Sequence, residues 1–94
     1  MATERLSWNE YVRLCLSYIL FEQNEDGSWT AEISPLIGCI TWGKTRAEAA
    51  IMAEDAVHGW LVLALRFGDP IPAIDGYTLA YLDDMTVESE ATYA

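Results

Sequence analysis

Few side chains in this sequence have the chemistry that a catalytic or metal site requires. His58 is the one histidine, and the two cysteines, Cys15 and Cys39, lie far apart without a CxxC spacing. Nucleophilic catalysis needs an activated serine or cysteine beside a base, and a zinc site needs several nitrogen or sulfur ligands. Both cysteines fall in apolar runs, where free cysteine behaves as a small hydrophobe. We therefore expect a structural His58, buried thiols, and no catalytic, cofactor-binding or metal-binding residue.

Carboxylates are the remaining candidates for chemistry. Glu22, Asp26 and Glu32 surround one expected hairpin, and Glu54 and Asp55 fall on one expected helix. Two-metal catalysis requires three or four carboxylates that converge on ions about 4 Å apart. Glu54 and Asp55 are adjacent in sequence and cannot share one helical stripe. We interpret the carboxylates as solvated, while a degenerate nuclease that uses Glu22, Glu32 and Asp55 stays open as a third hypothesis.

The net charge of the chain indicates which classes of molecule it can bind. Five Lys and Arg against fifteen Asp and Glu give a net charge of −10. Affinity for nucleic acids comes largely from protein cations that displace counterions, so direct binding to DNA or RNA is not expected. The same charge attracts a basic protein, although surplus carboxylates also keep a small domain soluble. No apolar stretch reaches the roughly 20 residues of a membrane span, and no secretory signal opens the chain, so we expect a cytoplasmic protein.

Capping, turn and periodicity signals predict the elements that position these residues. Ser7 with Glu10, and Thr45 with Glu48, have the capping-box form that begins helices, and Asp26-Gly27 favours a hairpin. The expected order is a helix over 8–14, strands over 16–23, 28–34 and 39–42, a long helix over 46–67, and a strand over 77–82. This order predicts one α+β domain of two layers, with its core over 16–82 and loose ends over 1–6 and 83–94.

Two features of this pattern suggest contacts with other chains. The first strand is apolar on both faces, as in strands that are covered on both sides. One long helix covers only one face, so the N-terminal helix or another subunit must cover the other. We therefore expect a homo-oligomer, with a dimer as the default. Trp8 and Trp42 are candidate interface anchors, since aromatic residues bury much area for little lost entropy; core packing is the alternative.

Six short motifs occur in a recognisable order between Tyr18 and Ile74. They are an acidic turn ending in glycine (25–27), an alternating strand (29–33), Pro-x-x-Gly-Cys (35–39), a short strand ending in glycine (40–43), Thr-x-x-Glu-Ala (45–49) and Gly-x-x-Ile-Pro (68–72). With the aromatic-rich strand before them, they resemble the HicB family of antitoxins. The resemblance covers more than half of the chain.

This resemblance implies a partial ribonuclease-H-like fold without that enzyme's catalytic carboxylates. It also implies a partner, a small basic HicA-like ribonuclease toxin, whose active site the antitoxin would cover. The chain ends before a C-terminal DNA-binding domain could fit, so we expect none. The residues expected to contact a partner are Glu22, Glu25, Asp26, Glu32 and Trp42.

Two functional hypotheses of different classes lead. The first is a toxin-neutralising antitoxin, which predicts a neighbouring reading frame for a small basic protein. The second is an orphan homo-oligomeric HicB-like module that has no toxin and binds another protein or a small ligand. Neither hypothesis requires catalysis.

Overall fold

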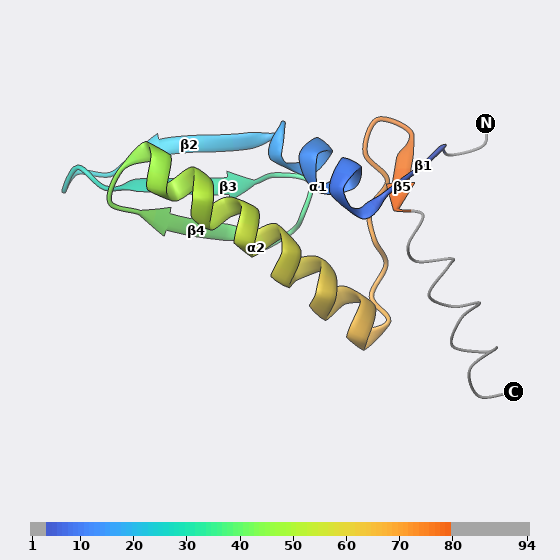
Figure 1. Cartoon of the computed structure of the whole chain (residues 1–94). Coiled ribbons are helices and arrows are strands. Elements are labelled where there is room, and N and C mark those ends of the chain that lie inside the picture. The colour runs from blue at the N-terminus through green and yellow to red at the C-terminus, as the bar shows by residue number, and fades with distance from the viewer. Residues whose placement is uncertain (1–3, 80–94) are drawn as a thin grey trace, which may run out of the picture.

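The capping and turn signals set most of the element boundaries in the computed structural model, which describes residues 4–79 (Figure 1). The elements in chain order are β1 (Glu4–Leu6), α1 (Trp8–Leu16), β2 (Ile19–Gln23), β3 (Trp29–Ile33), β4 (Ile40–Gly43), α2 (Arg46–Phe67) and β5 (Tyr77–Leu79). The expected α+β class is confirmed. One long helix lies against one face of a three-stranded sheet, and α1, β1 and β5 gather beyond one end of that sheet.

Both helices begin at the residues that the capping motifs predict. The Ser7 hydroxyl accepts a hydrogen bond from the Glu10 backbone N–H, and the Glu10 carboxylate accepts one from the Ser7 N–H. Thr45 caps α2 in the same way through the Glu48 N–H, but the Glu48 carboxylate binds the N–H of Lys44 instead of the cap residue. Gly68 ends α2 in the left-handed conformation (φ 70°), as expected of a glycine at this position.

The sheet has the order β2-β3-β4 with antiparallel pairing throughout. Its covered face packs on α2, where Ala31 and Ile33 meet a helix face of small and aliphatic side chains. Those helix residues are Ala49, Ala53, Val57, Leu61 and Ala64, all buried. The closest approach is at Gly43, where a Cβ atom would lie 2.3 Å from the Ala49 nitrogen. No other residue fits this contact without moving the helix.

The end of the domain beyond the sheet differs most from expectation. Residues 4–6 are not a loose end, because β1 pairs in parallel with β5 to form a separate two-stranded sheet. The strand at 77–79 therefore lies outside the main sheet, and residues 80–82 of the expected strand lie outside the described part of the chain. The prediction for 83–94 also falls outside it. A three-residue strand has too few positions to show alternation, so the sequence carries no signal for β1.

The fully buried Tyr11 side chain connects α1 to the chain after α2. Its hydroxyl donates a hydrogen bond to the carbonyl oxygen of Pro72. Burial raises the pKa of Tyr11 well above its ordinary value, with a smaller contribution from Cys15. Of the helices in residues 4–79, neither is both long and apolar enough to cross a membrane.

Candidate partner-binding face

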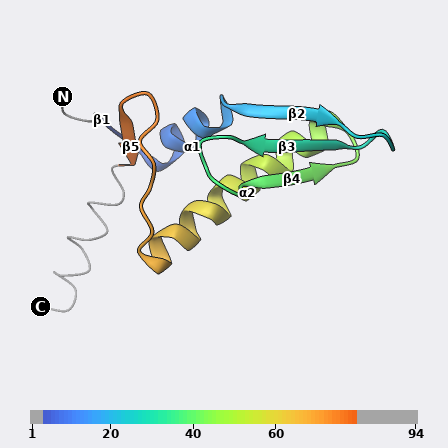
Figure 2. The ribbon, with the colours of Figure 1, turned by 180° about the vertical axis from the view of Figure 1, so that it is seen from behind.

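The second face of the three-stranded sheet is open. Successive side chains of a strand point to opposite faces of the sheet, so the residues next to the buried ones in each strand point to this open face. We define the open face as Leu20, Glu22, Thr30, Glu32, Ile40 and Trp42. The pairing register aligns them in two rows across the strands, Leu20–Glu32–Ile40 and Glu22–Thr30–Trp42. Figure 2 shows the sheet from this side, with α2 behind it.

Large apolar side chains are unusually exposed on the open face. Leu20 is 59% exposed, Ile40 57% and Trp42 48%. Single exposed hydrophobic residues are normal on protein surfaces, but a contiguous group of them marks an interaction site. The cross-strand register makes these three part of one surface. An aromatic and two aliphatic side chains provide the kind of contact area that protein interfaces bury.

Two carboxylates lie among these apolar side chains. Glu22 and Glu32 are exposed diagonal neighbours on β2 and β3, a geometry that sets side chains about 7–8 Å apart. Within residues 4–79 neither carboxylate has a hydrogen-bond or ion-pair partner. Two unpaired negative charges beside exposed apolar groups favour a partner that brings both basic and apolar side chains.

The two acidic residues of the hairpin turn lie beyond the strand ends, next to the open face. Asp26 accepts hydrogen bonds from the Ser28 N–H (2.9 Å) and hydroxyl (2.6 Å). These bonds hold the pKa of the Asp26 carboxyl below its ordinary value. The side chain of Asp26 therefore shapes the turn, whereas Glu25 is exposed without such bonds. Of the five predicted contact residues, Glu22, Glu32 and Trp42 share one surface, and Glu25 and Asp26 lie at its margin.

Sequence reasoning missed Leu20 and Ile40 as members of this surface. The second face of the first strand was expected to be covered by the N-terminal helix or by another subunit. The helix does not cover it, because α1 ends at Leu16 and does not lie over the sheet (Figure 1), and cover by another subunit stays a prediction. Leu20 is left uncovered by the described chain. The available signal was the alternation of Leu20 with Phe21 and of Ile40 with Thr41, which places each pair on opposite faces of its own strand. Only the pairing register places Leu20 and Ile40 on the same face as Glu32.

The three carboxylates of the nuclease hypothesis, Glu22, Glu32 and Asp55, do not form one site in this structure. Asp55 lies on α2, on the opposite side of the sheet from Glu22 and Glu32, so the three carboxylates of the nuclease hypothesis do not converge. In the described residues no group of three or more His, Cys, Asp or Glu is placed to hold a metal ion. This separation argues against the nuclease hypothesis.

His58 and Trp8 form a structural pair. The Trp8 Nε1–H donates to His58 Nδ1 at 2.8 Å, and the two rings stack with centroids 5.9 Å apart. This contact is of the kind expected of a structural histidine. Trp8 packs between α1 and α2, which corresponds to the packing alternative and not to an interface anchor.

The two cysteines are free and buried, as expected. Burial raises the pKa of the Cys15 thiol to about 12, with a smaller contribution from Cys39. Burial likewise raises the pKa of Cys39. A thiol with a raised pKa is a poor nucleophile, so neither has the properties of a reactive cysteine.

Two of the sequence motifs meet at an apolar groove of about 350 Å³. Its walls come from the loop at 35–37, the segment at 69–72 and Trp60 of α2. The Trp60 Nε1–H donates to the Ile37 carbonyl oxygen at 2.9 Å and fixes the loop against the helix. The Pro-x-x-Gly-Cys and Gly-x-x-Ile-Pro motifs are thus neighbours in space.

Comparisons with known proteins agree with this fold. Residues 10–72 match the family model described as UPF0150-like. The chain is also similar to the UPF0150 protein Ta0767 of Thermoplasma acidophilum, with 30% identity over 54 residues, 57% of this chain and 78% of that protein.

A solved structure shares the architecture. The crystal structure of TTHA0281 from Thermus thermophilus superposes with a TM-score of 0.64 at 24% identity, covering 72% of this chain and 86% of that one. At this identity the likeness concerns the fold alone.

Proposed function

The chain belongs to the UPF0150-like family, and from this premise we propose that it is a HicB-like antitoxin that binds a small basic HicA-like ribonuclease and covers its active site. In this role the chain acts in the cytoplasm and by binding alone, without catalysis. We propose further that the fold is a partial ribonuclease-H-like unit. UPF0150 proteins are related to HicB-like antitoxin-type proteins, which agrees with the six motifs of the sequence.

The observation that carries the proposal is the composition of the open face. An enzyme that acts on RNA presents cations to the phosphates of its substrate. A surface with two adjacent unpaired carboxylates can occupy the place of those phosphates. Leu20, Ile40 and Trp42 supply the apolar contact that exposed charges alone do not provide, since exposed ion pairs contribute little.

The net charge supports the same partner. A chain of charge −10 attracts a basic protein over a distance set by the ionic strength, which raises the association rate more than the affinity. The unpaired open-face carboxylates would then determine where the partner docks. This predicts an association rate that falls as salt rises, with a smaller effect on dissociation.

The first step of the test is to look for a neighbouring reading frame that encodes a small basic protein, which the proposal predicts. The second is a binding and inhibition assay with that protein. Calorimetry measures the dissociation constant, and cleavage of RNA by the partner measures inhibition. We expect Glu22→Lys with Glu32→Lys to raise the dissociation constant at least about tenfold, because two attractive contacts become repulsive. Trp42→Ala should raise it by about the same factor if Trp42 is an anchor.

The matched control is Glu54→Lys with Asp69→Lys, which makes the same change in net charge away from the open face. Both control positions are exposed. Equal loss of affinity in the two double variants would reduce the effect to net charge and contradict the proposed face. A neighbouring basic protein that does not bind would favour the orphan module, in which the open face binds a different partner.

A further inference from the structure

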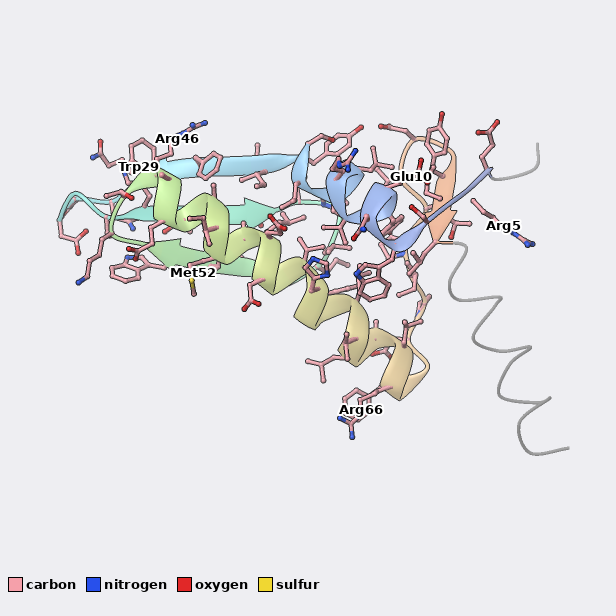
Figure 3. All side chains as sticks on the ribbon, viewed as in Figure 1. Arg5, Glu10, Trp29, Arg46, Met52 and Arg66 are labelled. Carbon is pink, nitrogen blue, oxygen red and sulfur yellow. The ribbon has the colours of Figure 1, made fainter. Side chains whose placement is uncertain are left out.

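The outward side of α2 carries a second exposed surface that is independent of the open face. Gly59 and five residues that lie three, four or seven positions from it are on this side, opposite the buried helix face. We define them as the outer stripe: Met52, Asp55, Gly59, Val62, Leu63 and Arg66, all exposed. Figure 3 shows that the labelled Met52 and Arg66 extend from the same side of the helix.

Gly59 has no explanation within the described chain. Glycine in a helix interior is less favourable than alanine because it loses more conformational freedom on folding. A Cβ atom at this position would meet nothing within 4 Å. It is not needed for close packing onto the sheet, unlike Gly43. A helix glycine in the centre of an exposed stripe is suited to the close approach of another backbone or side chain from outside.

The charges of the outer stripe are complementary to themselves. Asp55 and Arg66 lie on either side of Gly59, and within residues 4–79 neither has an ion-pair partner. A rise of 1.5 Å per residue sets them about 16 Å apart along the helix, too far to pair with each other. An antiparallel copy of the same helix would place Arg66 opposite Asp55 twice, once on each side of a two-fold axis.

The same register also places Val62, one of the apolar residues of the outer stripe. When Asp55 opposes Arg66 of a second copy, Gly59 opposes Val62 of that copy. Each valine then fills the space over a glycine, and the helices can approach at the short end of the usual range of about 8–10 Å. One register therefore pairs both charges and accommodates both valines.

From this complementarity we infer that the outer stripe of α2 docks antiparallel against the outer stripe of a second copy of this chain. The dimer is independent of the proposed antitoxin function. It leaves the open face of each sheet on the outside, available to a partner. Two copies of a chain of charge −10 repel each other. Salt screens this repulsion, so the dimer should be more stable at physiological salt than at low salt.

Sedimentation equilibrium of the 94-residue chain over a concentration series tests the dimer. A mass rising towards twice the 10.5 kDa of one chain is expected. Asp55→Arg and Arg66→Asp alone should each raise the dimer dissociation constant at least about tenfold, because each places like charges opposite each other twice. The double variant Asp55→Arg with Arg66→Asp should return the dissociation constant to within about threefold of wild type, since the pairs are re-formed in reverse.

Two further variants separate this interface from other causes. Glu54→Arg changes the net charge as Asp55→Arg does but lies off the outer stripe, so it should leave the dimer intact. Gly59→Leu keeps a good helix former and should weaken the dimer at least about tenfold while circular dichroism of the monomer is unchanged. A wild-type chain that is monomeric at every concentration, or a dimer that the charge reversals and Gly59→Leu leave intact, would overturn the inference and assign the outer stripe to another occupant.

Discussion

The two faces of the three-stranded sheet come from the same strands, yet they have opposite environments. On the covered face Ala31 and Ile33 are completely buried against α2. On the open face Leu20 and Ile40 remain more than half exposed. Alternation assigns a residue to a face, while only the placement of the helices decides which face is buried. Hydrophobic character on the open face is then available for binding.

The largest effect on the free energy of unfolding is expected when one isoleucine on each face of the sheet is truncated to alanine. Ile33→Ala removes a fully buried side chain and should cost about 2–5 kcal/mol of the free energy of unfolding through lost burial and a cavity. Ile40→Ala should cost less than about 1 kcal/mol, because the side chain is 57% exposed. Urea denaturation gives both values. Equal losses would mean that the open face is buried in the folded protein in solution.

A second test adds a methyl group where the covered face meets α2. Gly43→Ala places a Cβ against the Ala49 backbone and should destabilise the fold by about 1–3 kcal/mol through overpacking. Gly59→Ala is the matched control at concentrations where the chain is monomeric, since its Cβ has open space within one chain and alanine stabilises a helix by up to about 1 kcal/mol. Thermal melting of both variants measures the contrast. A Gly43→Ala protein as stable as wild type would show that α2 is not held at this distance.

The third test uses the pKa of a buried thiol in the core. The pKa of Cys15 is raised to about 12 in the folded chain because the thiol is buried. The unfolded chain therefore loses this proton at lower pH, and the stability is full below the ordinary thiol pKa and falls as pH rises towards 12.

Urea midpoints at pH 7, 8.5 and 10 measure this dependence. Cys15→Ala should reduce the slope but not abolish it, because the pKa of Tyr11 is raised by burial as well. Identical slopes for the variant and the wild type would contradict a buried, protonated Cys15.

Removing the two negative charges of the open face is expected to have the smallest effect on the free energy of unfolding. Glu22→Gln with Glu32→Gln should change the free energy of unfolding by no more than about 0.5 kcal/mol, because both side chains are exposed and unpaired in the described chain. Affinity for a basic partner should fall in the same variant. A loss of more than about 1 kcal/mol in stability would indicate a structural role for these carboxylates.

Much of the fold could be predicted because its signals are local. The hydroxyl and acidic side chains of the caps, the Asp26-Gly27 turn and the exit at Gly68 act within a few residues of the chain. The predicted long helix agrees with α2 from its first to its last residue. These features depend on backbone hydrogen bonds that neighbouring side chains can satisfy.

The remaining features depend on contacts that are distant in sequence. The expected strand at 16–23 begins only at Ile19, because α1 continues to Leu16 and Ser17 caps it. The missing cover over Leu20 follows from the path of α1 away from the sheet, which no local pattern encodes. For the candidate site, the sequence identified the charged residues and Trp42. That these residues share one face with Leu20 and Ile40 could be seen only from the pairing register of the strands.

The parallel pair of β1 and β5 joins the first and the last described strands, with Glu4 aligned with Tyr77. Bringing such distant segments together carries a large loop-closure entropy, which is offset only after the intervening chain has folded. This small ladder should therefore form late in folding. Its amide hydrogens should also exchange with solvent sooner than those of β3, which has a hydrogen-bonded strand on either side.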